Sequence, residues 1–193
     1  MVNQAVTNPR IFEVALVRQC APTLAGVKPG SIFTFHHTSE ESVREMVRQW
    51  DARLAPMGLS VQAIRECSRY AIVYVYRRSH LEQILSEENC HKFLLNAGYQ
   101  SAELDGLLAQ LTYRLQTQPE FPHEIGIFLG YPLRDVMGFI QNRGNNYTCS
   151  GLWKSYGDPS EAQACFAFYK KCSRTFCKLF EQGTPLEKLT VSA

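Results

Sequence analysis

The sequence lacks the short motifs by which many enzymes are recognised. It has no glycine-rich phosphate loop, no GxSxG nucleophile elbow and no HExxH zinc motif. Its seven cysteines form no CxxC pair and no dense framework like that of a small secreted domain. No run approaches the roughly 20 apolar residues of a membrane-spanning helix, and residues 1–10 do not resemble a signal peptide. We therefore expect reduced thiols, a cytoplasmic location and no membrane partner.

The composition is that of an ordinary globular protein. Hydrophobic residues make up 45% of the chain and charged residues 20%, which excludes disordered and fibrous classes. A chain of 193 residues can bury a core without disulfide or metal staples, so we expect residues 1–193 to form one domain. The net charge is only +2 and basic residues are interspersed with acidic ones, so no nucleic-acid partner is expected. We interpret the one basic stripe, Lys170, Lys171, Arg174 and Lys178, as a solvated helix face.

Hydrophobic periodicity and capping residues predict the order of the elements. Helices are predicted over residues 11–20, 38–54, 79–85, 90–97, 101–115, 122–129, 132–142 and 158–179, with caps at Thr38, Ser79 and Asp158. Strands are predicted over residues 31–35, 59–66, 70–76 and 151–156.

The strand over residues 70–76 is apolar on both faces, so we expect it to be central, paired as a hairpin with residues 59–66. The late strand over residues 151–156 is expected to join the same sheet. This order predicts an α+β fold, with a small, mostly antiparallel sheet of about three to four strands packed with several helices over one or both faces.

His123 and Glu124 are the first candidates for catalysis. They fall at the second and third positions of the helix that Pro122 is predicted to begin. The positive end of a helix dipole disfavours an imidazolium and favours a carboxylate, so His123 could act as base or ligand with Glu124 as its acidic partner. The alternative is that Glu124 only complements the dipole while His123 bonds a loop carbonyl.

Two cysteines are candidate nucleophiles. Cys20 ends the first predicted helix near Lys28, whose charge favours a thiolate, but a helix C-terminus and burial both oppose one. Cys149 lies in a polar turn and is the better candidate. Cys20, His123 and Cys149 are suitable metal ligands chemically, but none belongs to a locally spaced ligand pair, so no metal site and no particular cofactor is assigned.

Aromatic and cationic residues near the predicted strand ends could bind a planar or anionic ligand. Such side chains combine an apolar body with a polar or charged tip. The alternative is that they are ordinary amphipathic residues at sheet edges. The ligand-binding candidates are Lys28, Arg77, Tyr131, Trp153, Lys154 and Tyr156.

Several segments resemble a known family. They are Cys20-Ala-Pro-Thr-Leu-Ala-Gly-Val-Lys28, Val73-Tyr-Val-Tyr-Arg77, Phe121-Pro-His-Glu-Ile-Gly-Ile-Phe-Leu-Gly-Tyr-Pro132, Asp135-Val136 and Cys149-Ser-Gly-Leu-Trp-Lys154. In this order they resemble DUF3793, a bacterial domain of unknown function, over nearly the whole chain. The resemblance implies a bacterial cytoplasmic protein, and because the family has no established activity, it implies none for this chain. Ser155 stands where the resemblance leads us to expect a β-branched residue.

Three functional hypotheses follow from the sequence. The first is an enzyme or a small-molecule- or cofactor-binding protein whose pocket combines His123, Glu124 and a cysteine. The second is a non-catalytic protein-interaction module that uses the tyrosine-rich strand or the basic helix. The third is a metal- or haem-binding protein.

Overall fold

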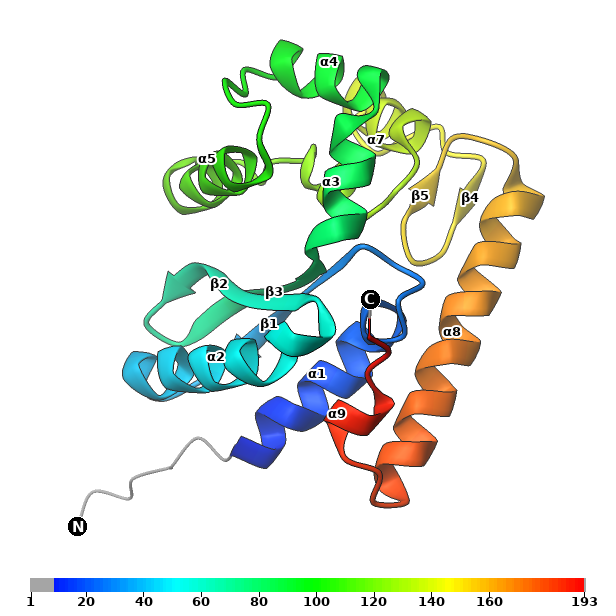
Figure 1. The fold of residues 1–193 in the computed structure, drawn as a ribbon. Coiled ribbons are helices and arrows are strands. Elements are labelled where there is room, and N and C mark those ends of the chain that lie inside the picture. Colours follow the sequence, from blue (N-terminus) through cyan, green and yellow to red (C-terminus); the bar gives the residue numbers. More distant parts are fainter. Residues whose placement is uncertain (1–8, 193) are drawn as a thin grey trace.

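A three-stranded antiparallel sheet forms the centre of the protein. The computed structural model describes residues 9–192 (Figure 1), so much of the segment in which we expect no signal peptide lies outside the described residues. β3 (Tyr70–Arg77) lies between β1 (Gly30–His36) and β2 (Leu59–Cys67), and both neighbours are antiparallel to it. The predicted central position of this strand is confirmed.

Helices cover both faces of the sheet because side chains of β3 alternate between two cores. Val73 and Val75 face a core shared with α1 (Pro9–Leu24) and α2 (Glu40–Leu54). Tyr74 and Tyr76 face a second core. That core is completed by α3 (Arg78–Ser86), α4 (Glu88–Asn96), α5 (Leu104–Thr117), α6 (Ile125–Phe128) and α7 (Leu133–Gln141). The predicted α+β fold is confirmed.

A long helix lies along one side of the molecule. α8 (Pro159–Glu181) packs against α1 (Figure 1), and its N-cap Asp158 accepts a 2.8 Å hydrogen bond from the backbone N–H of Ser160. The short α9 (Leu186–Leu189) then returns to the first core. Among residues 9–192, no helix combines the length and apolar character needed to cross a membrane.

Four predicted helix starts or ends were wrong, and one of them is that of α5, which begins at Leu104 and not at Ser101. α1 continues past Cys20 to Leu24, because Pro22 lies in its last turn, where little helix remains to be broken. α2 is capped by the side chain of Ser39, which accepts from the N–H of Ser42, and not by Thr38. α3 begins at Arg78 directly after β3, so Ser79 is already inside the helix that it was expected to cap.

The late strand was predicted to join the main sheet, and this was also wrong. The segment instead forms a separate hairpin, in which β5 (Lys154–Ser155) pairs with β4 (Cys149–Ser150). The hairpin connects α7 to α8 (Figure 1), and polar contacts to α7 replace the strand pairing that we expected. The main sheet therefore has three strands among the described residues.

The helix predicted over residues 122–129 is shorter than expected. Only α6 (Ile125–Phe128) is helical, so His123 and Glu124 precede it in a tight turn. In this turn the N–H of Gly126 donates to the carbonyl of His123 at 3.2 Å. The argument that a helix dipole acts on these two side chains therefore does not apply.

Close backbone contacts fix the segment around α6 to the sheet. The Tyr74 hydroxyl donates a 2.6 Å hydrogen bond to the carbonyl of Phe128. Gly30 permits this approach, since a Cβ there would lie 2.7 Å from the Tyr74 hydroxyl oxygen. Gly130, at φ +73°, packs equally closely against Pro29. The residues that follow Gly130 are thereby held at a fixed position relative to the sheet.

Candidate functional site

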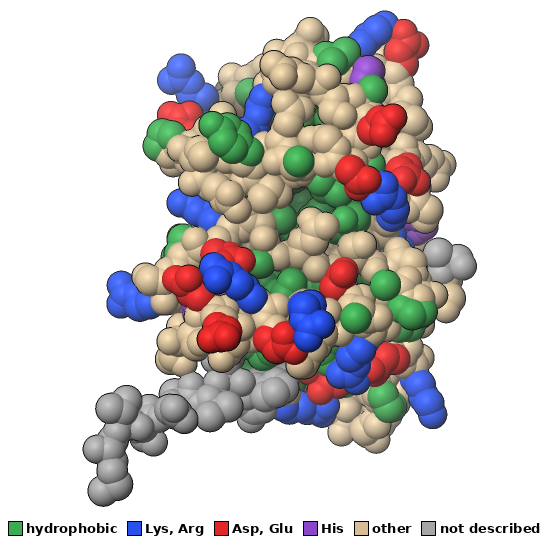
Figure 2. Space-filling view, turned by 60° about the vertical axis from the view of Figure 1, so that its left-hand side comes forward, with side chains coloured by type: hydrophobic (Ala, Val, Ile, Leu, Met, Phe, Trp, Pro, Cys, Tyr) green, Lys and Arg blue, Asp and Glu red, His purple; other side chains and the backbone are tan. Residues whose placement is uncertain are grey.

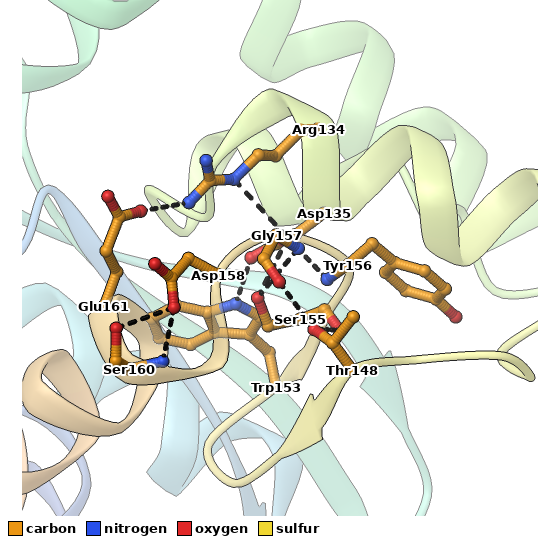
Figure 3. A network of polar contacts seen from close by, with 10 residues as sticks. All are labelled: Arg134, Asp135, Thr148, Trp153, Ser155, Tyr156, Gly157, Asp158, Ser160 and Glu161. Carbon is orange, nitrogen blue, oxygen red and sulfur yellow. Dashed lines mark hydrogen bonds and ion pairs between the residues drawn. The ribbon is translucent and has the colours of Figure 1, made fainter.

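A buried carboxylate holds the β4–β5 hairpin against α7. Asp135 of α7 accepts hydrogen bonds from the Trp153 indole Nε1 at 2.8 Å, the Ser155 hydroxyl at 3.1 Å and the Tyr156 backbone N–H at 2.7 Å (Figure 3). Asp135 is 2% exposed, so water cannot readily replace these donors. Ser155, where we expected a β-branched residue, contributes one of them. The network fixes the orientation of Trp153.

Trp153 stands between several aromatic side chains. Its ring stacks on Tyr131, with centroids 4.7 Å apart and planes 23° apart, and it meets Phe166 of α8 edge-on at 4.5 Å. Stacked and edge-to-face pairs at these distances are favourable beyond the area that they bury. The Tyr131–Trp153 stack forms a wall that two cavities share.

The first of these, which we call the apolar cavity, has a volume of about 410 Å³. This is within the usual size range of small-molecule sites, about 300–1,000 Å³. Hydrophobic and aromatic side chains from the α6–α7 region and the hairpin make up most of its lining, including Ile125, Leu129, Tyr131, Val136, Phe139 and Trp153.

Polar residues complete the apolar cavity, which Asp135 and Ser150 line together with His123 and Lys154. His123 is exposed, and its ring meets Phe139 edge-on at 4.8 Å. Lys154 donates a 2.7 Å hydrogen bond to the carbonyl of Gly144, and its amine lies 5.8 Å from the Phe139 ring centroid. The structure thus brings four predicted residues, His123, Tyr131, Trp153 and Lys154, to one cavity.

The second, which we call the cationic cavity, lies on the other side of the stack and also has a volume of about 410 Å³. Its basic lining residues are Arg18 from α1, Lys28 from the loop after α1, and Lys170 and Arg174 from α8. Tyr131, Trp153 and Tyr169 provide aromatic rings. None of the described lining residues is an Asp or Glu.

Lys28 is the least exposed of these four cations. Its amine lies 5.4 Å from the centroid of the Tyr131 ring. Burial, opposed in part by the nearby thiols of Cys20 and Cys165, lowers the pKa of Lys28 to about 8. A substantial share of this amine is therefore uncharged in mildly alkaline solution.

Glu124 faces away from His123. It is buried and accepts a 2.8 Å hydrogen bond from Arg114 of α5 and a 3.3 Å hydrogen bond from the Tyr99 hydroxyl. Arg114 also donates to the carbonyl of Ala97. Glu124 therefore ties the turn before α6 to α5, and the two adjacent side chains do not form an acid–base pair.

Arg77 also lies away from both cavities. It is 1% exposed and donates to the carbonyls of Thr23 and Leu24 at 2.7 Å and of Val191 at 2.6 Å. These contacts satisfy the last carbonyls of α1 and attach the segment after α9 to them. The guanidinium is occupied by backbone groups and has little capacity left for a ligand.

The remaining candidates have mainly structural surroundings. Cys20 lies in the first core, where burial raises the pKa of its thiol to about 12, so it is protonated at neutral pH. Cys149 is half-buried and pairs with Ser155 across the hairpin, one residue before the segment that lines the apolar cavity. Tyr156 packs over Gly138, and its buried hydroxyl has no hydrogen-bond partner among the described residues.

Sequence reasoning missed Asp135 and three of the four cations. The sequence did contain a signal for Asp135. This residue lies next to Val136 and four residues before Phe139, so helical periodicity places this carboxylate beside the apolar face of the helix, where it can be buried. Arg18 had none, and Lys170 and Arg174 were noted only as part of a basic stripe interpreted as a solvated helix face, since only the packing of α1 against α8 brings the three together.

No group of three or more His, Cys, Asp or Glu side chains placed to hold a metal ion occurs within residues 9–192. Cys20, His123 and Cys149, which we weighed as ligands, thus form no such group.

Comparison with protein families identifies the chain. The profile of a protein family of unknown function, DUF3793, matches residues 16–190. The chain belongs to the DUF3793 family. The match includes both cavities and the Asp135 network, which are thus parts of the family's domain in this chain. No curated protein and no solved structure matches it.

Proposed function

We propose that this DUF3793 protein binds a small molecule with a flat, apolar body in the apolar cavity. The observation that carries the proposal is the Tyr131–Trp153 stack, which Asp135 holds in place through the indole N–H. A preformed aromatic wall binds a planar ligand with little loss of side-chain entropy. His123 and Lys154 are the polar groups that would orient such a ligand.

The surroundings of the wall support binding more directly than catalysis. His123 has an aromatic neighbour in Phe139, while Glu124 and Cys20 are turned into the protein interior. The function proposed is therefore recognition, with His123 as a hydrogen-bonding group. The free cysteines agree with the bacterial cytoplasmic setting that the sequence leads us to expect.

Tryptophan fluorescence offers a direct test, because the chain has only two tryptophans. Trp50 lies in the first core, away from the cavities, so a Trp50→Phe protein reports on Trp153 alone. Native mass spectrometry of freshly purified protein is used to detect a co-purifying ligand. The released compound, or the dye 8-anilinonaphthalene-1-sulfonate if none is found, is then titrated against the Trp50→Phe protein. We expect saturable quenching of Trp153.

Substitutions at the rim give the control. His123→Ala in the same background should weaken binding several-fold, because it removes a polar group of the cavity. His36→Ala should leave binding unchanged, because His36 is also exposed but lies at the end of β1, with its ring centroid 6.2 Å from that of Tyr70 and outside the lining of the apolar cavity. Unquenched Trp153 emission with every compound tested, or equal effects of the two histidine variants, would contradict the proposal.

A further inference from the structure

The four cations of the cationic cavity form no ion pair with a described carboxylate, whereas half of the other basic side chains of the protein do. Seven arginines elsewhere, Arg10, Arg44, Arg48, Arg53, Arg78, Arg114 and Arg134, each form an ion pair with a carboxylate. On the face drawn in Figure 2, several Lys and Arg side chains lie beside Asp and Glu side chains. By contrast, none of the four cations of the cavity lies within 4.0 Å of a described carboxylate.

Like charges that converge on one cavity repel each other and favour a negative occupant. Lys170 and Arg174 are four residues apart, so they lie on the same face of α8, and Arg18 of α1 lines the same cavity. Lys28 adds an amine deeper in the protein, beside the Tyr131 ring. Four cations can contact a group that carries two negative charges through several charge-assisted hydrogen bonds.

The uncharged part of the lining limits the occupant further. The rings of Tyr131, Trp153 and Tyr169 give the cavity aromatic walls, on which a flat ring can stack. The hydroxyl of Tyr169 donates to the carbonyl of Val27 at 3.3 Å, which holds that ring beside the loop that carries Lys28. A ligand that is only an inorganic anion would leave these walls without a partner.

We propose that the cationic cavity binds a small molecule in which a phosphate group is attached to a flat heterocycle, as in a nucleoside monophosphate. The phosphate contacts Lys28, Lys170 and Arg174, and the heterocycle lies against the aromatic walls. The charged contacts come from α1, α8 and the loop after α1, none of which lines the apolar cavity. This second site therefore goes beyond the function proposed above and can be tested separately.

The shape of the site favours a small ligand over a nucleic acid. Lys171 and Lys178 belong to the same basic stripe in the sequence, but neither lines the cavity. A nucleic acid would follow an extended basic surface and use all of these residues, whereas a nucleotide uses only those that face the cavity. The nucleotide and the nucleic-acid hypotheses therefore predict different effects on affinity when Lys171 and Lys178 are replaced.

Isothermal titration calorimetry with AMP, GMP and UMP tests the proposal. We expect at least one nucleotide to bind more tightly than its nucleoside and than inorganic phosphate, with an affinity that falls as salt is added. The Lys170→Gln/Arg174→Gln double variant should weaken that binding by about tenfold to a hundredfold, because it removes two charge-assisted contacts that are each worth up to about tenfold in affinity. The matched Lys171→Gln/Lys178→Gln variant, on the same helix, should bind like the unmodified protein.

Dependence on pH adds a second test at Lys28. Its amine interacts with the thiols of Cys20 and Cys165 and lies 5.4 Å from the Tyr131 ring centroid, and Tyr169 and the other three cations line the same cavity. Nucleotide affinity should fall as pH rises through the pKa of Lys28, about 8 for the free protein. In Lys28→Met this component of the pH dependence should be absent.

Three results would overturn the proposal. The first is that none of the three nucleotides binds at millimolar concentration. The second is that nucleoside and nucleotide bind equally. The third is that the two double variants lose affinity equally, or that a single-stranded oligonucleotide binds more tightly than the nucleotides, because either would point to an extended basic surface. None of these results bears on quenching of Trp153 by an apolar ligand, so the two proposals can fail separately.

Discussion

Replacing Asp135 by asparagine should destabilise the protein and release Trp153. The substitution keeps the size and shape of the side chain but exchanges one acceptor oxygen for an NH2 group. One Asp135 oxygen accepts from the Ser155 hydroxyl and the Tyr156 N–H, and the other accepts from the Trp153 indole. In either orientation, the amide of the substituted side chain leaves at least one of these donors facing another donor.

The expected cost follows from burial. Asp135 is 2% exposed and Ser155 is 1% exposed, so a donor that loses its acceptor there gains little from water. Losing one hydrogen bond to a charged group costs about 1.5–3 kcal/mol. The Arg134 contact adds little, because its Nε lies 4.0 Å from Asp135 Oδ1 and its side chain is half exposed. We therefore expect the free energy of unfolding to fall by about 1.5–3 kcal/mol.

Urea denaturation followed by circular dichroism measures this loss. Asp158→Asn is the matched control, because Asp158 caps α8 in the same region (Figure 3) and asparagine caps a helix about as well as aspartate. Fluorescence of both variants in the Trp50→Phe background reports on Trp153. We expect a red shift for Asp135→Asn only, because the orientation that keeps the two bonds from Ser155 and Tyr156 turns the NH2 group toward the Trp153 indole.

Equal unfolding midpoints for Asp135→Asn and the unmodified protein, with unchanged Trp153 emission, would refute this reasoning. Such a result would mean that the hairpin is held by packing alone. If Asp158→Asn were destabilised to the same extent, charge removal near α8 would be the cause and not the geometry of the three hydrogen bonds.

Two further predictions concern residues outside the cavities. Arg77→Met should lower the free energy of unfolding by about 3 kcal/mol, measured by urea denaturation, because the buried carbonyls of Thr23 and Leu24 lose a charged donor and keep only the backbone N–H groups of Gly26 and Val191; an unchanged midpoint would contradict this role. The buried thiol of Cys20, with its pKa raised to about 12, should resist iodoacetamide in the native protein and react in urea, as read by peptide mass spectrometry, with half-buried Cys149 as the comparison. Equal native labelling rates would contradict the assignment of Cys20 to the core.

The sheet could be predicted because its signals are local. The alternation of Val73 and Val75 with Tyr74 and Tyr76 predicts a strand apolar on both faces, and the structure places a core on each side. The separate hairpin formed by residues 149–155 could not be predicted in the same way. The pattern of residues 151–156 is compatible with a strand, but their hydrogen-bonding partner is the side chain of Asp135, not a strand of the sheet.

The candidate site could be predicted only in part, because aromatic and cationic character is visible in a sequence but direction is not. His123, Tyr131, Trp153 and Lys154 line the apolar cavity as a group. Glu124 and Arg77 have the same chemical character, but their side chains point to Arg114 and to the end of α1. The direction in which a side chain points depends on packing between elements that are distant in the sequence. Because α6 begins only after Glu124, the predicted helix also did not indicate the direction of the Glu124 side chain.

The wall formed by Tyr131 and Trp153 connects the two proposals, and the cations of α8 distinguish them. Tyr131 and Trp153 line both cavities, so a change that frees Trp153 should affect both, whereas the cations of α8 line only one. Asp135→Asn should therefore weaken the binding of both the apolar ligand and the nucleotide. If two different ligands bind, Lys170→Gln/Arg174→Gln should weaken nucleotide binding alone. If one ligand occupies both cavities, the same variant should weaken binding in both titrations. Comparing the two variants in the same titrations decides whether the protein has two sites or one divided site.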